Sequence, residues 1–269
     1  SYTVGSTVPV NTFLLTYDGS TWSYTPPFNQ PGGVLRYYSW YPASPTGNTP
    51  TSSSYTFAYT INAEASQEDL IAATITTADA AVTLPFNHIL SQVNFALQKA
   101  LGVKIELTNI AVNGVKNTGT YTFGATTPWA ATSSTATYSY TPVPGSNITD
   151  GTSTGISYMG NGGGVYTNDN ALMLLPQSFP SETDGSFSFD YKLTIIGDDS
   201  PNNDVIKTGS ITADLSDFDT SVWAPGKRYI YLIDFSRFLT GGPITSVSYS
   251  PLRAQQTEAD LLSRPLLEN

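Results

Sequence analysis

The sequence predicts an all-β protein with little helix, and three observations support this. Apolar and polar residues alternate along several segments, which is the period of a strand with one buried face. Glycine (22 residues) and proline (18 residues) cluster between these segments and mark turns. Charged residues make up only 12% of the chain, about half the usual share. Many short strands separated by turns fold as packed sheets.

The clearest predicted strand is 187–195, in which apolar and polar residues alternate without interruption. The segment 229–235 repeats this period, but Ile230 and Leu232 add apolar residues to the second face. We therefore expect that strand to be buried on both faces. Four other segments have the pattern of strands: Thr56–Ile61, Val103–Val112, Ala171–Leu175 and Ser210–Leu215.

Two segments also fit a helix. Ser66 followed by Asp69 resembles a capping signal and predicts about two helical turns over Gln67–Ala73. Ile89–Leu101, followed by Gly102, fits an amphipathic helix with a glycine cap. The same segment also fits a strand, and the local pattern alone slightly favours the helix.

Charge and composition exclude several classes of function. The formal net charge is −10 and no basic run is present, so nucleic acid is not an expected partner. The chain has no cysteine, which excludes disulfides and thiolate metal sites. No apolar stretch of the length needed for a membrane-spanning helix is present.

The side chains that could carry chemistry have simpler structural explanations. His88 is the single histidine, and its neighbours Phe86 and Ile89 predict a strand position held by packing or hydrogen bonding. Oxygen-bearing residues alternate in a segment that could surround calcium, but a solvated loop explains the segment better. These residues are Asp198, Ser200, Asn202 and Asp204.

Scattered carboxylates could in principle supply an acid–base pair of a glycosidase, but sequence cannot show that two of them converge. Glu68 and Asp69 are explained as favourable charges in the first turn of the predicted helix. We therefore predict no catalytic residue, no cofactor and no metal site, and a protein that is not an enzyme.

Aromatic residues are concentrated near the start of the chain, where Trp22, Tyr24, Tyr38 and Trp40 are candidates for an adhesive surface. Aromatic faces bind sugar rings and protein partners well. The alternative is that these side chains belong to the core, and the sequence leaves both interpretations open.

Six segments occur in an order and spacing that resembles the fimbrillin-like pilins of Bacteroidetes, the type V fimbrial subunits. The resemblance extends over roughly residues 34–240. The segments are RYYSWYP (Arg36–Pro42), SQEDLIAATI (Ser66–Ile75), LPFNHILSQVNFAL (Leu84–Leu97), LMLLPQSF (Leu172–Phe179), FSFDYKLTI (Phe187–Ile195) and WAPGKRYIYLIDF (Trp223–Phe235).

This resemblance implies two tandem transthyretin-like β-sandwich domains, which we expect at residues 1–84 and 85–269. It implies that Phe86–Leu97 is a strand, which decides the ambiguous segment in favour of β structure. It also implies export through the outer membrane from a lipoprotein precursor, and a place at the cell surface in a fimbrium. Other fimbrial subunits are the implied partners, joined by exchange of a strand after an N-terminal strand has been removed by proteolysis.

The segment 244–250 is a candidate terminal assembly strand, through Ile244, Val247 and Tyr249. The residues that follow, 251–269, form a polar tail unlike the apolar strand with which the family often closes. Host or bacterial surface proteins or glycans are further expected partners of the aromatic residues. The alternative function is a monomeric extracellular carbohydrate-binding β-sandwich.

Overall fold

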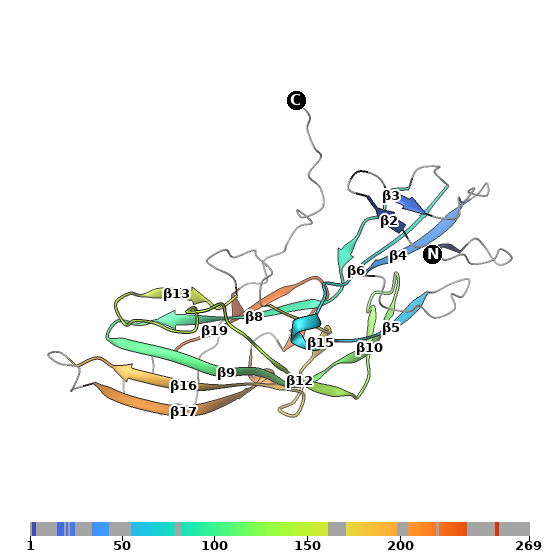
Figure 1. Ribbon diagram of the computed structural model, residues 1–269. Helices are drawn as coiled ribbons and strands as arrows, with labels where there is room; N and C mark the ends of the chain where they lie inside the picture. Colours follow the sequence, from blue (N-terminus) through green and yellow to red (C-terminus); the bar gives the residue numbers. More distant parts are fainter. Residues whose placement is uncertain are drawn as a thin grey trace. The chain divides into compact units, whose positions relative to one another are not determined.

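The computed structural model describes residues 2–3, 15–18, 20, 22–24, 34–42, 55–78, 82–160, 171–197, 204–218, 221–235 and 251–252 (Figure 1). Helical structure in these residues is limited to two single 3-10 turns, η1 (Glu64–Ser66) and η3 (Leu215–Asp217). Within the same residues no helix is long and apolar enough to cross a membrane. The all-β fold that the sequence predicts is confirmed.

The chain forms two compact units, each made of segments that are not contiguous in the sequence. Unit 1 comprises Ser1–Thr60, Glu68–Ile89 and Thr118–Thr132, and unit 2 comprises Ile61–Gln67, Leu90–Asn117 and Ser133–Asn269. The contiguous domains expected from the sequence, 1–84 and 85–269, differ from these units mainly at Thr118–Thr132. That segment returns to unit 1 because its strand β10 pairs with β5, a contact that sequence position does not reveal.

The strands of unit 1 pair antiparallel throughout the described residues. One sheet has the order β1 (Tyr2–Thr3), β4 (Leu35–Tyr41), β6 (Ile71–Thr77) and β7 (Asn87–His88). A second has the order β11 (Trp129–Ala131), β10 (Thr118–Thr122) and β5 (Thr56–Thr60). A two-stranded sheet pairs β2 (Leu15–Tyr17) with β3 (Trp22–Tyr24).

Unit 2 contains two larger sheets. The first has the order β12 (Thr135–Ser139), β9 (Val103–Lys116), β16 (Ser186–Ile195) and β17 (Val205–Asp214). The second has the order β13 (Gly155–Tyr158), β8 (Ser91–Lys99), β19 (Arg228–Ile233) and β20 (Pro251–Leu252), and β14 (Leu172–Leu174) also pairs with β8. A small sheet pairs β15 (Gln177–Ser178) with β18 (Val222–Trp223).

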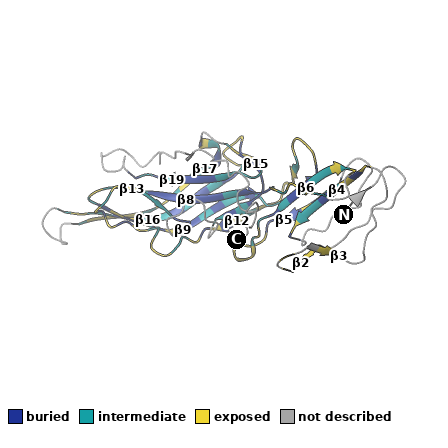
Figure 2. Cartoon of the chain, turned by 90° about the horizontal axis from the view of Figure 1, so that it is seen from above, coloured by how far each residue is buried: buried dark blue, intermediate teal, exposed yellow. Residues whose placement is uncertain are grey.

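Aromatic rings join the two larger sheets of unit 2 into a sandwich. Phe187 of β16 lies 5.1 Å from Phe95 of β8 and 4.4 Å from Tyr231 of β19, measured between ring centroids. The dark blue of β8 and β19 in Figure 2 marks their burial. Tyr231 is 2% and Ile230 is 9% exposed, so β19 is buried on both faces, as the sequence predicts.

Two local predictions have different outcomes. Ser91–Lys99 is the strand β8, so the resemblance decided the ambiguous segment correctly. The helix predicted over Gln67–Ala73 is wrong, because strand β6 begins at Ile71 and the only helical turn nearby in the described residues is η1. The segment Ile71–Thr77 is rich in β-branched residues, and every one of its residues pairs with β4. Pairing with a distant strand therefore overrides the local capping signal.

Replacing Gly151 by alanine should destabilise unit 2. Gly151 has φ +73°, and a Cβ there would lie 2.7 Å from Ile196 Cδ1 and 3.0 Å from the backbone of Val103. Left-handed backbone and overpacking together should lower the free energy of unfolding by about 2–4 kcal/mol, measured by urea denaturation.

The matched control is Gly145→Ala. Gly145 has φ +83°, but no atom of the described residues other than those of Gly145 and its two chain neighbours lies within 4 Å of its added Cβ. Only the backbone effect of about 1–2 kcal/mol should remain. Equal losses in the two variants would contradict the importance of the close approach at Gly151.

Candidate assembly edges and aromatic cluster

Strand β4 of unit 1 has two unequal neighbours. On one side β6 pairs with all seven of its residues, from Leu35 to Tyr41. On the other side, in the part of the chain that the structure describes, β1 pairs with it only at Arg36 and Tyr37. A strand side covered by so short a partner is a template for the addition of another strand.

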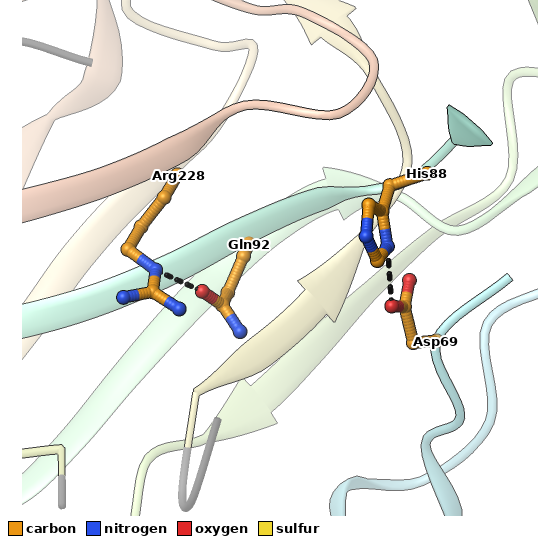
Figure 3. A network of polar contacts seen from close by, with 4 residues as sticks. All are labelled: Asp69, His88, Gln92 and Arg228. Carbon is orange, nitrogen blue, oxygen red and sulfur yellow. Dashed lines mark hydrogen bonds and ion pairs between the residues drawn. The ribbon is translucent and has the colours of Figure 1, made fainter. Parts of the chain in front are cut away.

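Strand β19 of unit 2 has the same arrangement. All six of its residues pair in parallel with β8, from Arg228 opposite Gln92 to Ile233 opposite Leu97. Arg228 Nε also donates a hydrogen bond to Gln92 Oε1, a side-chain contact between two residues that face each other in this register (Figure 3). On its other side, within the described residues, β20 pairs with β19 at Ile230 and Tyr231 only.

Such short pairings are weak contacts. Each backbone hydrogen bond contributes about 0.5–1.5 kcal/mol net, because it replaces a hydrogen bond to water. Strands β1 and β20 contain two residues each, so each forms only a few such bonds. We name the side of β4 that faces β1, and the side of β19 that faces β20, the two candidate assembly edges.

The core of unit 1 is an aromatic cluster with rings from several strands and the segments next to them. Tyr38 stacks on Tyr55 at 5.3 Å between centroids, and Phe57 stacks on Tyr121 at 5.2 Å. The members of the aromatic cluster are Tyr38, Trp40, Tyr55, Phe57, Tyr121, Phe123 and Trp129. Tilted and edge-on rings of this kind stabilise beyond their buried area by about 0.5–1.5 kcal/mol per pair.

The structure distinguishes among the four candidate adhesive aromatics. Tyr38 is 3% exposed and belongs to the core, the alternative that the sequence left open for these residues. Trp40 is half-buried at the border of the aromatic cluster. Trp22 and Tyr24 lie in β3, whose register places them opposite Tyr17 and Leu15. An adhesive role of Trp22, Tyr24 and Trp40 stays a prediction.

Two other predicted features fall largely outside the described residues. Ile244, Val247 and Tyr249 of the candidate terminal assembly strand lie there, directly before β20 in the sequence. Most of the loop considered for calcium lies there as well. Its last residue, Asp204, accepts a hydrogen bond from the backbone N–H of Gly197 at 3.1 Å. Among the described residues, no group of three or more potential metal ligands occurs.

Several carboxylates of the chain make structural hydrogen bonds within the described residues. Glu64 accepts a hydrogen bond from the backbone N–H of Ser139, and Asp184 accepts one from that of Ser181 at 2.9 Å. Asp69 binds His88, a contact between residues 19 positions apart that the sequence did not reveal. The expected role of Glu68 and Asp69 in a helix first turn is wrong, since no helix forms there.

Two packed sheets with alternating buried residues and an aromatic core are typical of β-sandwich proteins. The fold therefore assigns this chain to the all-β, sandwich-like class. The chain belongs to the fimbrillin-like family, whose profile matches residues 3–251. The family resemblance inferred from the sequence is therefore confirmed.

Similar structures have been solved from several species of Bacteroides. A fimbrial protein from Bacteroides vulgatus has the same fold, with a TM-score of 0.58 at 13% identity, over 88% of this chain and 82% of that chain. A putative cell adhesion protein from Bacteroides uniformis matches with a TM-score of 0.44 at 15% identity, over 87% and 76% of the two chains. Another from Bacteroides ovatus matches with a TM-score of 0.41 at 14% identity, over 83% and 68%. No curated protein matches the chain.

Family membership has three consequences at a general level. The chain is a fimbrial or adhesive protein, its place is the cell surface, and its partners include other fimbrial subunits. How the subunits join is a separate question.

Two substitutions in β4 should distinguish a core aromatic residue from an exposed one by their effect on the free energy of unfolding. Tyr38→Ala removes a ring from the aromatic cluster and should lower the free energy of unfolding by about 3–5 kcal/mol. Tyr41 is 62% exposed, so Tyr41→Ala should change the free energy of unfolding by about 0.5 kcal/mol or less. Urea denaturation followed by tryptophan fluorescence measures both, and a neutral Tyr38→Ala would contradict the assignment of this ring to the core.

Proposed function

We propose that this chain is a structural and adhesive subunit of a bacterial surface fimbria, and that its subunits join by exchange of a strand. The observation that carries this proposal, beyond family membership, is the pair of candidate assembly edges. β4 and β19 are each fully paired on one side and paired over two residues on the other, in the described residues. A strand from a neighbouring subunit would extend that short pairing.

The energy available to such an exchange is sufficient for a durable joint. A donated strand satisfies backbone N–H and C=O groups of the edge and buries every second side chain. Burial of about five apolar side chains contributes roughly 7–15 kcal/mol before the entropy of association is subtracted. A contact between two different surfaces of the subunit does not close on itself, so it propagates as a filament.

The segment with Ile244, Val247 and Tyr249 is the proposed donor strand. Three of its residues, Ile244, Thr245 and Val247, are β-branched, as suits an extended strand. It directly precedes β20, which already pairs antiparallel with β19 of the same chain. Exchange between chains would then use the geometry that the isolated chain uses for itself, as in domain swapping.

Further parts of the proposal come from the family. They are two tandem transthyretin-like sandwich domains, a lipoprotein precursor, export through the outer membrane, and no catalysis. Trp22, Tyr24 and Trp40 are the proposed contacts to a host or bacterial surface protein or glycan.

A monomeric carbohydrate-binding module is the weaker alternative. A sugar platform needs several aromatic rings on one face of a sheet. Trp40 and Tyr41 are adjacent in β4, and successive side chains of a strand point to opposite faces. These two partly exposed rings therefore do not form one platform.

Proline substitution in the proposed donor strand tests strand exchange. Val247→Pro removes a backbone donor from the strand and should lower the filament yield of the concentrated full-length chain at least about tenfold. Negative-stain electron microscopy and size-exclusion chromatography measure this yield, and circular dichroism checks that the sheets remain.

The matched control is Gln256→Pro, which places the same residue in the polar tail. It should leave the filament yield unchanged. A wild-type chain that stays monomeric with intact sheets, or filaments that persist in Val247→Pro, would count against strand exchange through this segment.

A further inference from the structure

The histidine of this chain forms an ion pair inside unit 1. His88 lies in β7, and its Nδ1 donates to Asp69 Oδ2 at 2.5 Å (Figure 3). The two side chains are 39% and 32% exposed, so solvent reaches them but does not surround them. The pair joins the segment at Asp69, which leads into β6, to strand β7. The backbone pairing between β6 and β7 alone would hold these two segments only weakly.

The strand that His88 occupies is a marginal element. β7 has two residues, and it pairs with β6 only where His88 faces Ile71 and Asn87 faces Ala72. The backbone N–H of Ile89 adds one hydrogen bond to Leu70 O at 2.9 Å. Because Asp69 directly precedes Leu70, the ion pair lies at the end of this short ladder and reinforces it.

The charges around the ring within unit 1 are few. The strands packed beside it, β6 and β7, contain no other ionisable residue, and neither do residues 82–86 or β11. Glu68 is the neighbouring carboxylate, and it acts on Tyr59, whose pKa is raised first by burial and then by that charge. Asp69 is thus the carboxylate that acts on the pKa of His88.

The carboxylate of Asp69 depends on this partner. Its second oxygen, Oδ1, is buried and has no hydrogen-bond partner among the described residues. A buried carboxylate oxygen without a donor is costly, and a positive charge on the neighbouring ring compensates part of that cost. The pair is therefore more stable with a charged imidazolium than with a neutral imidazole.

The pKa of His88 is raised above 6.5, first by the hydrogen bond to Asp69 and further by its charge, while burial opposes the shift. A raised folded-state pKa means that the stabilisation is fully present below pH 6.5. It is lost as the pH rises through the folded-state pKa. Acid conditions therefore strengthen this contact and alkaline conditions weaken it.

We propose that the His88–Asp69 pair is a pH-sensitive latch, which fastens β7 to β6 when the ring is charged and loosens it when the ring is neutral. This device is independent of strand exchange, because it lies on the opposite side of β6 from β4 and the candidate assembly edge. Release would open the edge of β6 at Ile71 and Ala72.

A proton NMR titration of the imidazole C–H signals in the full-length chain tests the charge state. One histidine gives one set of signals, so the assignment needs no further variant. The wild-type midpoint should lie above 6.5, and Asp69→Asn should lower it. Glu68→Gln is the matched control, since it removes the adjacent carboxylate without touching the pair, and the midpoint should remain close to that of the wild type.

Urea unfolding and amide hydrogen exchange test the latch itself. Between pH 6 and pH 9 the folding equilibrium constant of the wild type should fall about two- to fivefold more than that of Asp69→Asn, as for an exposed ion pair. Protection of the Ile89 amide, corrected for intrinsic exchange, should fall in the same range only in the wild type.

His88→Gln serves if Asp69→Asn does not fold, and its stability should likewise lack this pH dependence. A histidine midpoint at or below 6.5 would overturn the proposal. Equal pH dependence of Ile89 protection in the wild type and both variants would overturn it as well.

Discussion

The parallel pairing of β8 with β19 is the contact on which unit 2 depends. Gln92 and Arg228, which face each other in this pairing, are 136 residues apart in the sequence. Parallel strands need a long crossover connection, and here most of unit 2 lies within that connection. Phe95 and Tyr231 then contact Phe187 of the opposite sheet, so the pairing also holds the sandwich together.

Side-chain hydrogen bonds hold β19 independently of its second neighbour β20. The hydroxyl of Tyr231 accepts from Trp223 Nε1 at 2.8 Å, and that of Tyr229 accepts from the backbone N–H of Ala224 at 2.7 Å. Burial raises the pKa of both hydroxyls, which therefore stay protonated and neutral. β19 is thus anchored by β8 and by these bonds, and its core contacts do not require β20.

The local sequence pattern predicted the strands that do not need a particular partner strand to be recognised. The alternation at 187–195 predicted β16, and the segment at 229–235, apolar on both faces, predicted β19, because burial specifies such strands. Gln67–Ala73 was predicted wrongly because the strand β6 exists through its pairing with β4. The two-residue strands β1 and β20, and the contact of His88 with Asp69, have no local signal at all. Each depends on residues brought together by the fold.

The difference between central and outer strands explains which edges suit assembly. β17 ends the order of its sheet and pairs with β16 along all ten of its residues, so it is also an edge. It carries Lys207, and a lysine on an outer strand is a common protection against unwanted pairing. β4 and β19 are instead interior strands with a neighbour on both sides, and rings from them lie in the core. In the proposed strand exchange, a donated strand there would continue a buried sheet, and the gain in apolar burial would favour these two edges over β17.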